Sequence, residues 1–350
     1  MLALTFQGVE TLRLVDAAEP RIEDPGDVIV RVRLAGVCGS DLHVYHGRER
    51  GLDPGTILGH EFVGEVAAVG PEVRRWKRGD AVLSPFTTSC GDCGPCRAGL
   101  TSRCERGRLF GWRENGVGLH GGQAELVRVP LADSTLVRMP RGVSSEAALF
   151  AGDVLATGYF GVDAAGVRRE STLAVVGCGP VGLMAVLTAA DLGVAAIWAI
   201  DRVPERLAIA ARLGATPIDL DRDDPVALAR GTPIDAVVEA VGSPAAARLA
   251  FDLVRPGGTV AAVGVHTEPH FAFSPGEAYD KNLTYRAGRC PVRHYLERVL
   301  PLARRYDREL QALVSHRLPL ADGIRGYELF AGRREGCTKV VLRPRPEDAG

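Results

Sequence analysis

Four cysteines lie within the stretch CGDCGPCRAGLTSRC, at Cys90, Cys93, Cys96 and Cys104. The spacing C-x2-C-x2-C-x7-C lets tight turns direct four thiolates at one tetrahedral zinc ion, with sulfur about 2.3 Å from the metal. A ferredoxin-type iron–sulfur cluster needs a shorter final spacing and a following proline, where this chain has Glu105. Four unconnected thiols would be a liability to oxidation. We therefore expect a structural zinc with no open position for a substrate.

A second, looser set of metal-ligating residue types consists of Cys38 in GVCGSDLH, His60 in GHE and Asp153 in GDVLATGY. A thiolate, an imidazole and a carboxylate with a fourth position left open are typical of catalytic zinc. Each residue also has an ordinary structural interpretation, as a buried cysteine, a core histidine or a helix-capping aspartate. The residue types alone leave both interpretations open.

A glycine loop follows an apolar run in TLAVVGCGPVGLMAVL, with Gly177, Gly179 and Gly182 at its turns. Between a strand and a helix, such glycines allow a tight turn, close approach of a pyrophosphate and close helix packing. Asp201 ends the next apolar run, where a carboxylate accepts the ribose hydroxyls of NAD and repels a 2′-phosphate. Arg202 is the argument for NADP, and a helix cap near Glu205 is the structural alternative for Asp201.

In their order and spacing these motifs, together with GHEFVGEV, resemble the zinc-dependent medium-chain alcohol dehydrogenase family over nearly the whole chain. The resemblance implies two zinc ions per chain, with Cys38, His60 and Asp153 as ligands of the catalytic ion and Glu61 as a transient ligand. Many relatives have cysteine where Asp153 stands. Aspartate there resembles the formaldehyde-dehydrogenase-like and bacterial secondary-alcohol branches, and its oxygen should make the metal a stronger Lewis acid.

The resemblance also implies a proton relay from Ser40 through the cofactor ribose to His43 at the surface, and an Asp41 carboxylate that orients His60. Phe86 and Val265 match positions that line the substrate pocket, and we add Trp112. Gly39 departs from relatives that have a basic residue there for the cofactor phosphates. The cofactor contacts that we expect on this basis are Gly177, Gly179, Pro180, Val181, Gly182, Asp201, Arg202, Thr157, Val241, Val263, Val265 and Lys339, the last at the pyrophosphate.

The elements that must position these residues fall into two patterns. Short alternating runs such as VIVRVRLAG, broken by Gly and Pro, predict an antiparallel β-rich region up to about residue 155. From Ser171, apolar runs alternate with glycine turns and helical patterns, which predicts a parallel sheet covered on both faces. The predicted class is α/β: a GroES-like catalytic domain over 1–155, completed by a helix and a strand within 290–350, and a doubly wound Rossmann domain over 156–289.

Composition limits the partners. Asp and Glu number 43 against 42 Lys and Arg, so no broad basic surface indicates nucleic acid or membrane binding. No apolar run reaches the roughly 18 residues of a membrane helix, and MLALTFQGVETLRLVDAAEP lacks the pattern of a secretory signal. We expect a cytoplasmic homo-oligomer, a tetramer rather than a dimer, that interconverts an alcohol and an aldehyde or ketone with NAD. A zinc hydrolase and a catalytically silent binding protein are the alternatives.

Overall fold

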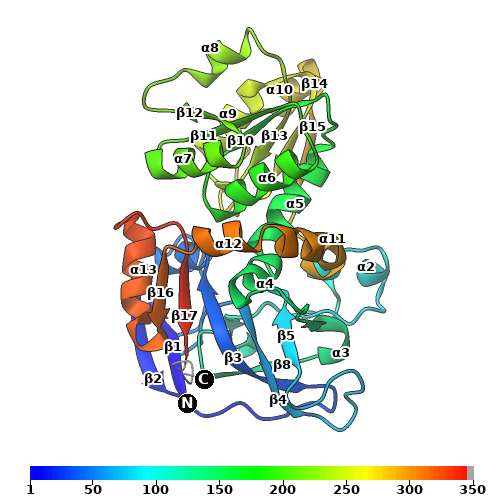
Figure 1. The fold of residues 1–350 in the computed structure, drawn as a ribbon, viewed down its shortest axis with the longest axis vertical. Coiled ribbons are helices and arrows are strands. Elements are labelled where there is room, and N and C mark those ends of the chain that lie inside the picture. Colours follow the sequence, from blue (N-terminus) through cyan, green and yellow to red (C-terminus); the bar gives the residue numbers. More distant parts are fainter. Residues whose placement is uncertain (345–350) are drawn as a thin grey trace. The chain divides into compact units, whose positions relative to one another are not determined.

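The computed structural model describes residues 1–344, which form two compact units (Figure 1). The first unit comprises Met1–Asp153 together with the chain from Pro291 onward, and the second comprises Val154–Cys290. The chain thus leaves the first unit at Asp153 and returns to it at Pro291.

The first unit is built on a mixed sheet in the order β16-β17-β3-β4-β5-β9, with β8 paired to β3. The β3–β4, β4–β5 and β3–β8 pairs are antiparallel, which confirms the prediction for this region. Two two-stranded sheets, β1–β2 and β6–β7, accompany it. The strands are β1 (Leu2–Gly8), β2 (Thr11–Asp16), β3 (Val28–Val37), β4 (Phe62–Val69), β5 (Ala81–Ser84), β6 (Trp112–Glu114), β7 (Val117–Leu119), β8 (Leu126–Val129), β9 (Val137–Arg138), β16 (His316–Pro319) and β17 (Val340–Arg343).

Short helices connect these strands, and the longer ones lie near the end of the chain. The VRHYLERVLPLARRY pattern predicts a helix, and α11 confirms it in spite of Pro301. The helices and turns of the unit are α1 (Asp41–Tyr45), α2 (Gly94–Arg97), η1 (Thr101–Arg103), α3 (Ala132–Thr135), α4 (Ser145–Ala151), α11 (Val292–Arg305), α12 (Asp307–Leu313), η2 (Leu320–Asp322) and α13 (Gly323–Gly332).

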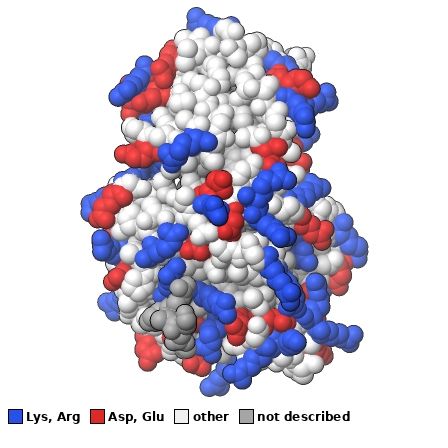
Figure 2. Space-filling view, viewed as in Figure 1, with Lys and Arg blue, Asp and Glu red and all other residues white. Residues whose placement is uncertain are grey.

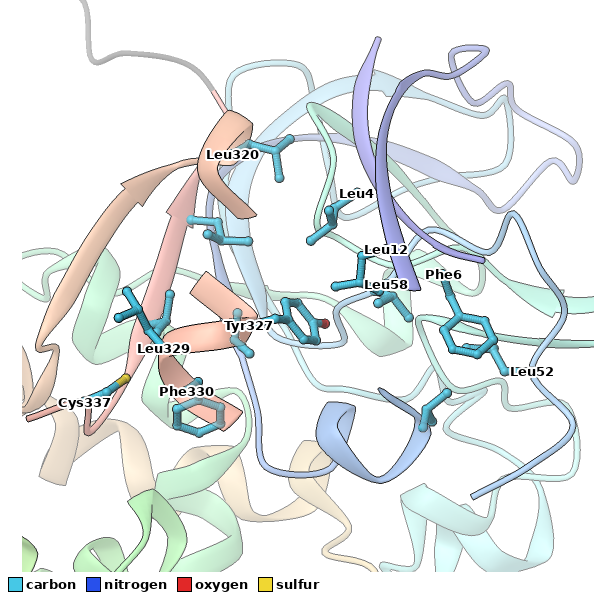
Figure 3. Packing of buried hydrophobic residues seen from close by; sticks show 14 residues of the cluster. Leu4, Phe6, Leu12, Leu52, Leu58, Leu320, Tyr327, Leu329, Phe330 and Cys337 are labelled. Carbon is cyan, nitrogen blue, oxygen red and sulfur yellow. The ribbon is translucent and has the colours of Figure 1, made fainter. Parts of the chain in front are cut away.

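The core of the first unit joins residues from both ends of the chain. Leu4, Phe6 and Leu12 from β1 and β2 pack with Tyr327 and Phe330 of α13 in one buried cluster (Figure 3). The phenol of Tyr327 donates a hydrogen bond to the Gln123 side chain at 3.0 Å, so its polar end is satisfied inside the core. Burial of these apolar side chains fixes the C-terminal elements on the N-terminal ones.

The second unit contains a six-stranded sheet in the order β12-β11-β10-β13-β14-β15, in which every pair is parallel. The strand order reverses at the β10–β13 pair, as in a doubly wound sheet with helices on both faces, which confirms the predicted fold class. The elements are α5 (Val154–Ala165), β10 (Thr172–Val176), α6 (Pro180–Asp191), β11 (Ala196–Asp201), α7 (Pro204–Arg212), β12 (Thr216–Asp219), α8 (Pro225–Ala229), β13 (Ile234–Glu239), α9 (Pro244–Leu253), β14 (Val254–Ala262), α10 (Pro275–Asp280) and β15 (Thr284–Ala287).

The strands of this sheet are apolar because both faces are covered. β10 reads TLAVV and its last four residues are buried, without the alternation of a strand that faces water. On the face shown in Figure 2, acidic and basic side chains are interspersed. Within the described residues, no helix is both long and apolar enough to span a bilayer.

Candidate active site

Cys38, His60 and Asp153 converge in the first unit although they are far apart in the sequence. Cys38 follows the last residue of β3, His60 precedes β4, and Asp153 follows α4. The Nε2 atom of His60 lies 3.2 Å from Oδ2 of Asp153, and Sγ of Cys38 lies 3.6 Å from the same oxygen. In a tetrahedral zinc site with bonds of 2.0–2.3 Å, neighbouring ligand atoms are about 3.3–3.8 Å apart. The three donors therefore fit a zinc ion.

The backbone at both ends of α4 lets Asp153 lie close to the sheet. The Ser144 side chain caps α4 by accepting the Ala147 N–H, which fixes where the helix begins. At the other end a Cβ on Gly152 would lie only 2.7 Å from the carbonyl oxygen of Ser84. The absence of a side chain at Gly152 thus lets Asp153 approach the end of the sheet.

The pocket stabilises positive charge. All three donors are buried, and burial raises the pKa of the Cys38 thiol. Burial lowers the pKa of His60, but the Asp41 carboxylate and hydrogen bonds to Asp153 raise it well above the usual value of imidazole. Burial raises the pKa of Asp153, yet the hydrogen bond from His60 lowers it below the ordinary value overall. A cation at the centre of these donors would be favoured, as a metal site requires.

Asp41 lies on the opposite side of the imidazole from Asp153. Its Oδ1 atom is 3.2 Å from Nδ1 of His60, and its Oδ2 atom accepts the backbone N–H of Cys38 at 2.9 Å. When His60 donates its Nδ1 proton to Asp41 in a hydrogen bond, the lone pair of its Nε2 atom faces the other donors. This is the contact that the sequence analysis expects of Asp41.

Ser40 and Phe86 also lie beside His60. The Ser40 hydroxyl is 3.3 Å from Nε2 of His60, so it borders the donor set. The Phe86 ring meets the imidazole edge to face with centroids 6.2 Å apart. His43 differs from the expectation, because its side chain is buried, with 8% exposed, instead of lying at the surface. It belongs to the short helix α1, whose packing covers it. Trp112 packs against the cluster of Figure 3.

Glu61 lies beside these three donors, and its partner is Lys339. One of its carboxylate oxygens and the donor atoms of Cys38, His60 and Asp153 all lie within 4.8 Å of one another. We expected Lys339 to meet the cofactor pyrophosphate, but Lys339 is 1% exposed and its ammonium group donates to both Glu61 oxygens, at 2.6 and 2.5 Å. Burial raises the pKa of Glu61 to about 6, although Lys339 acts in the opposite direction.

The four cysteines of the lobe also converge. The Sγ atoms of Cys90 and Cys96 are 3.9 Å apart, as are those of Cys93 and Cys104. Tetrahedral zinc with sulfur at about 2.3 Å would place them about 3.8 Å apart. Backbone N–H groups donate to two of the sulfurs, from Cys90 to Cys104 and from Cys93 to Cys90. The lobe therefore fits one enclosed zinc ion, and burial raises the pKa of Cys96 to about 12, so a cation is needed to hold its thiolate.

The glycine loop of the second unit connects β10 to α6. Gly177 has a φ of 91°, which side chains rarely tolerate, and a Cβ on Gly182 would overlap the carbonyl oxygen of Gly177. A Cβ on Gly179 would find no atom closer than Nη1 of Arg206, at 4.0 Å. Pro180 and Val181 begin α6, whose N-terminal N–H groups suit an anion. The loop thus leaves open space where a pyrophosphate would lie.

Asp201 is held by the backbone around it. Its Oδ2 accepts the Cys178 N–H at 2.6 Å, and its Oδ1 accepts those of Arg202 and Val203 at 2.7 and 3.0 Å. Since a carboxylate has about four acceptor positions, one remains on Oδ2. The Arg202 side chain is paired with Asp221. Helix α7 takes Val203 as its N-cap and has no side-chain cap, so Asp201 does not cap it.

The other expected cofactor residues lie at the ends of strands or in α5. Val241 follows β13, and Val263 and Val265 follow β14. Val241 and Val265 are among the exposed large hydrophobic residues, 45% and 37% exposed. Thr157 is a buried residue of α5. The carboxyl ends of parallel strands are where doubly wound sheets bind ligands.

Three residues near these sites escaped the sequence analysis. A Cβ on Gly36 would overlap Oε2 of Glu61, so this glycine makes room for the carboxylate. Arg206 reaches the glycine loop from α7. Glu239, fully buried at the end of β13, accepts the N–H groups of Val241 and Gly242 and lies 2.8 Å from Nε2 of His266. Of the three, only Arg206 could have been predicted from the sequence, because it is a basic residue five positions after Asp201.

Comparisons with known proteins give consistent matches over both units. The family model for the alcohol dehydrogenase GroES-like domain matches residues 24–141, and the model for zinc-binding dehydrogenases matches residues 180–305. The chain is 39% identical to zinc-type alcohol dehydrogenase B of Aspergillus flavus, over 98% of this chain and 81% of that protein. It is 35% identical to a probable zinc-binding alcohol dehydrogenase of Mycobacterium tuberculosis, over 99% and 90% of the two chains.

Solved structures agree with these matches. Alcohol dehydrogenase TADH from Thermus sp. ATN1 is 44% identical, with a TM-score of 0.92 over 99% of this chain and 100% of that one. Zinc-dependent alcohol dehydrogenase 2 from Streptococcus pneumoniae is 32% identical, with a TM-score of 0.90 over 100% of both chains.

Proposed function

Because the chain belongs to the zinc-dependent medium-chain alcohol dehydrogenase family and is an oxidoreductase, we propose that Cys38, His60 and Asp153 hold its catalytic zinc and that NAD is its hydride acceptor. The observation that carries the proposal is the convergence of these donors, 3.2 and 3.6 Å apart, in a buried pocket. The reaction interconverts an alcohol with an aldehyde or ketone.

The residues of the pocket have separate tasks. When bound, zinc polarises the substrate oxygen and makes its proton easier to lose. Asp41 keeps the Nε2 lone pair of His60 directed at the metal position. The Ser40 hydroxyl, beside that nitrogen, accepts the substrate proton, and His43, three residues further on, is the next acceptor in the relay. Phe86 packs on His60 and restricts water.

NAD, and not NADP, is the proposed cofactor. The loop at Gly177, Gly179 and Gly182 leaves room for a pyrophosphate at the start of α6. The free acceptor position of Asp201 suits a ribose hydroxyl and opposes a 2′-phosphate. Arg202, the argument for NADP, is engaged by Asp221. Thr157, Val241, Val263 and Val265 would line the rest of this cofactor site.

We further propose two zinc ions per chain, a homotetramer and a cytoplasmic location. The cysteine lobe and the pocket at Cys38 are two separate donor sets, which supports the metal count. Phe271 contacts Tyr285 of the edge strand β15, with ring centroids 5.4 Å apart, and is itself 69% exposed, and Tyr279 of α10 is 82% exposed; exposed aromatic side chains of this kind favour assembly over a monomer. Clustered thiols with metal-binding spacing suit a reducing compartment.

The test is a panel of primary, secondary and aromatic alcohols and a thiol adduct of formaldehyde, each offered with NAD and with NADP and followed by the absorbance of reduced nicotinamide. We expect turnover with NAD, and the panel identifies the alcohol class. Asp153→Ala should stay folded but lose its activity and one zinc ion per chain. Asp280→Ala, in the exposed helix α10, is the control and should keep the activity and both zinc ions. Ester or amide cleavage without nicotinamide reduction would indicate a zinc hydrolase. If the protein catalyses neither cleavage nor nicotinamide reduction, it would instead be a catalytically silent binding protein.

A further inference from the structure

Glu239 is a fully buried carboxylate at the carboxyl end of β13, and both of its side-chain oxygens are engaged. Its Oε1 atom accepts the backbone N–H groups of Val241 and Gly242 at 2.7 and 2.8 Å. Its Oε2 atom lies 2.8 Å from Nε2 of His266, a residue of the turn after β14. A buried carboxylate is costly unless donors surround it, so the imidazole is part of what allows a charge at this position.

Glu239 also joins the turn after β13 to the turn after β14 through its backbone. Its carbonyl oxygen accepts the N–H groups of Val263 and Gly264 at 2.9 and 3.1 Å. The two turns meet without room for a side chain. A Cβ on Gly242, whose φ is 78°, would lie 2.2 Å from the carbonyl oxygen of Val265, and a Cβ on Gly264 would lie 2.2 Å from the Gly242 nitrogen. The two turns therefore form one packed unit that Glu239 holds.

This pair of turns lies beside the glycine loop. A Cβ on Gly177 would lie only 2.4 Å from Cγ2 of Val241. In the sheet, β11 with Asp201 at its end lies on one side of β10, and β13 and β14 lie on the other side. With the adenosine ribose at Asp201 and the pyrophosphate at the loop after β10, the rest of a dinucleotide extends over the ends of β13 and β14.

The two turns present an apolar surface at that place. Val241 and Val265 are 45% and 37% exposed. His266 directly follows Val265, and its side chain, 28% exposed, turns back to Glu239. The hydrogen bond with Glu239 raises the pKa of His266, which favours the charged and more strongly donating form of the ring. Because the two residues are adjacent in the chain, the tether at His266 also fixes where Val265 lies.

We propose that His266 is a positioning residue: through its hydrogen bond to Glu239 it holds the turn after β14 so that Val265, with Val241, contacts the nicotinamide half of the cofactor. The inference rests on the proposed function, since it requires NAD at the carboxyl edge of this sheet. It divides the cofactor site into two parts. The adenosine half depends on Asp201 and the glycine loop, and the nicotinamide half depends on the Glu239–His266 contact.

Calorimetric titration of the full-length protein with NAD and with ADP measures the two parts separately, because ADP has the adenosine and two phosphates but no nicotinamide. In His266→Ala the affinity for NAD should fall roughly 10-fold or more, because the lost hydrogen bond has a charged acceptor. The affinity for ADP should equal that of the wild type. His266→Gln keeps an N–H donor and should recover part of the loss. The exposed His270→Ala, in the same connection between β14 and α10, is the control.

Thermal unfolding without cofactor separates this role from a merely structural one. His266→Ala leaves Glu239 with one donor fewer, so its melting temperature should fall. Combining it with Glu239→Gln removes the unpaired buried charge, so stability should recover while the loss of NAD affinity persists. The combined variant also serves if His266→Ala does not fold.

Three results would overturn the inference: unchanged NAD affinity in His266→Ala, an equal loss of affinity for NAD and for ADP, or full recovery of NAD affinity in the combined variant. A wild type that binds neither NAD nor ADP would instead count against the proposed function.

Discussion

One carboxylate oxygen of Asp41 lies 3.2 Å from Nδ1 of His60. The other oxygen accepts the N–H of Cys38, so a single side chain fixes two of the three metal donors. Asp41 is the first residue of α1, so this short helix connects the turn after β3, which holds Cys38, with the segment before β4, which holds His60.

Asp41→Asn should therefore weaken the catalytic metal by about 10- to 100-fold, because the neutral amide orients the imidazole less strongly. Competition with a chromogenic chelator measures the affinity, and circular dichroism checks the fold. Asp80→Asn is a matched control, since Asp80 is a buried carboxylate that binds Arg138 at 2.9 Å. It should reduce stability and leave metal affinity intact. Equal metal affinity in Asp41→Asn and the wild type would contradict this role.

Cys104→Ser should reduce the zinc content by one ion per chain and lower the melting temperature. Structural zinc in small peptides contributes apparent binding free energies of about 10–16 kcal/mol, so a glycine-rich lobe should depend on it. Elemental analysis of the purified protein gives the count. Cys337→Ser, a buried cysteine in the cluster of Figure 3, is the control and should keep both ions. If Cys104→Ser retains the wild-type zinc content, the lobe is not a zinc site.

Asp201→Ala should lower kcat/KM for NAD and raise it for NADP, because a like charge no longer opposes the 2′-phosphate. The three backbone N–H groups that donate hydrogen bonds to Asp201 would also lose their acceptor. The affinity for NAD and the affinity for NADP should therefore both fall by a similar amount from this cause. The ratio of kcat/KM for the two cofactors separates preference from that loss. A wild type that prefers NADP would refute the assignment.

His120 should make stability decline in mildly acidic solution. Burial, with Arg113 beside it, lowers the pKa of His120 to about 4. In the unfolded chain this pKa is about 6.5, so between about pH 6.5 and pH 4 the unfolded chain takes up a proton that the folded one does not, and stability falls. Because the residue as a whole is exposed, solvent screens the effect, which should be about 1 kcal/mol or less.

Urea unfolding at pH 7.5 and pH 5 measures this dependence. His120→Gln should lessen the difference between the two pH values, and the exposed His270→Gln should leave it as in the wild type. An identical pH dependence in His120→Gln and the wild type would show that other groups account for it.

The sequence predicts those parts of the site whose residues lie close together along the chain. The cysteine lobe and the glycine loop lie within short segments, so spacing alone predicts their geometry. Asp153 was a candidate ligand by residue type, but only the resemblance to a family motif favoured it over an ordinary structural role. The partner of Lys339 could not be read from the sequence, because Glu61 is distant along the chain and the two meet only through the β17–β3 pairing. The buried place of His43 depends equally on packing that no local pattern encodes.

The return of the chain to its first sheet has a consequence for biosynthesis. β3 emerges from the ribosome before the whole of the second unit, but its neighbour β17 emerges only after that unit. The parallel-sheet unit Val154–Cys290 has no such dependence and can fold as soon as it has emerged. Until β17 arrives, the nascent chain has an unpaired β3 edge and a Glu61 carboxylate without its lysine.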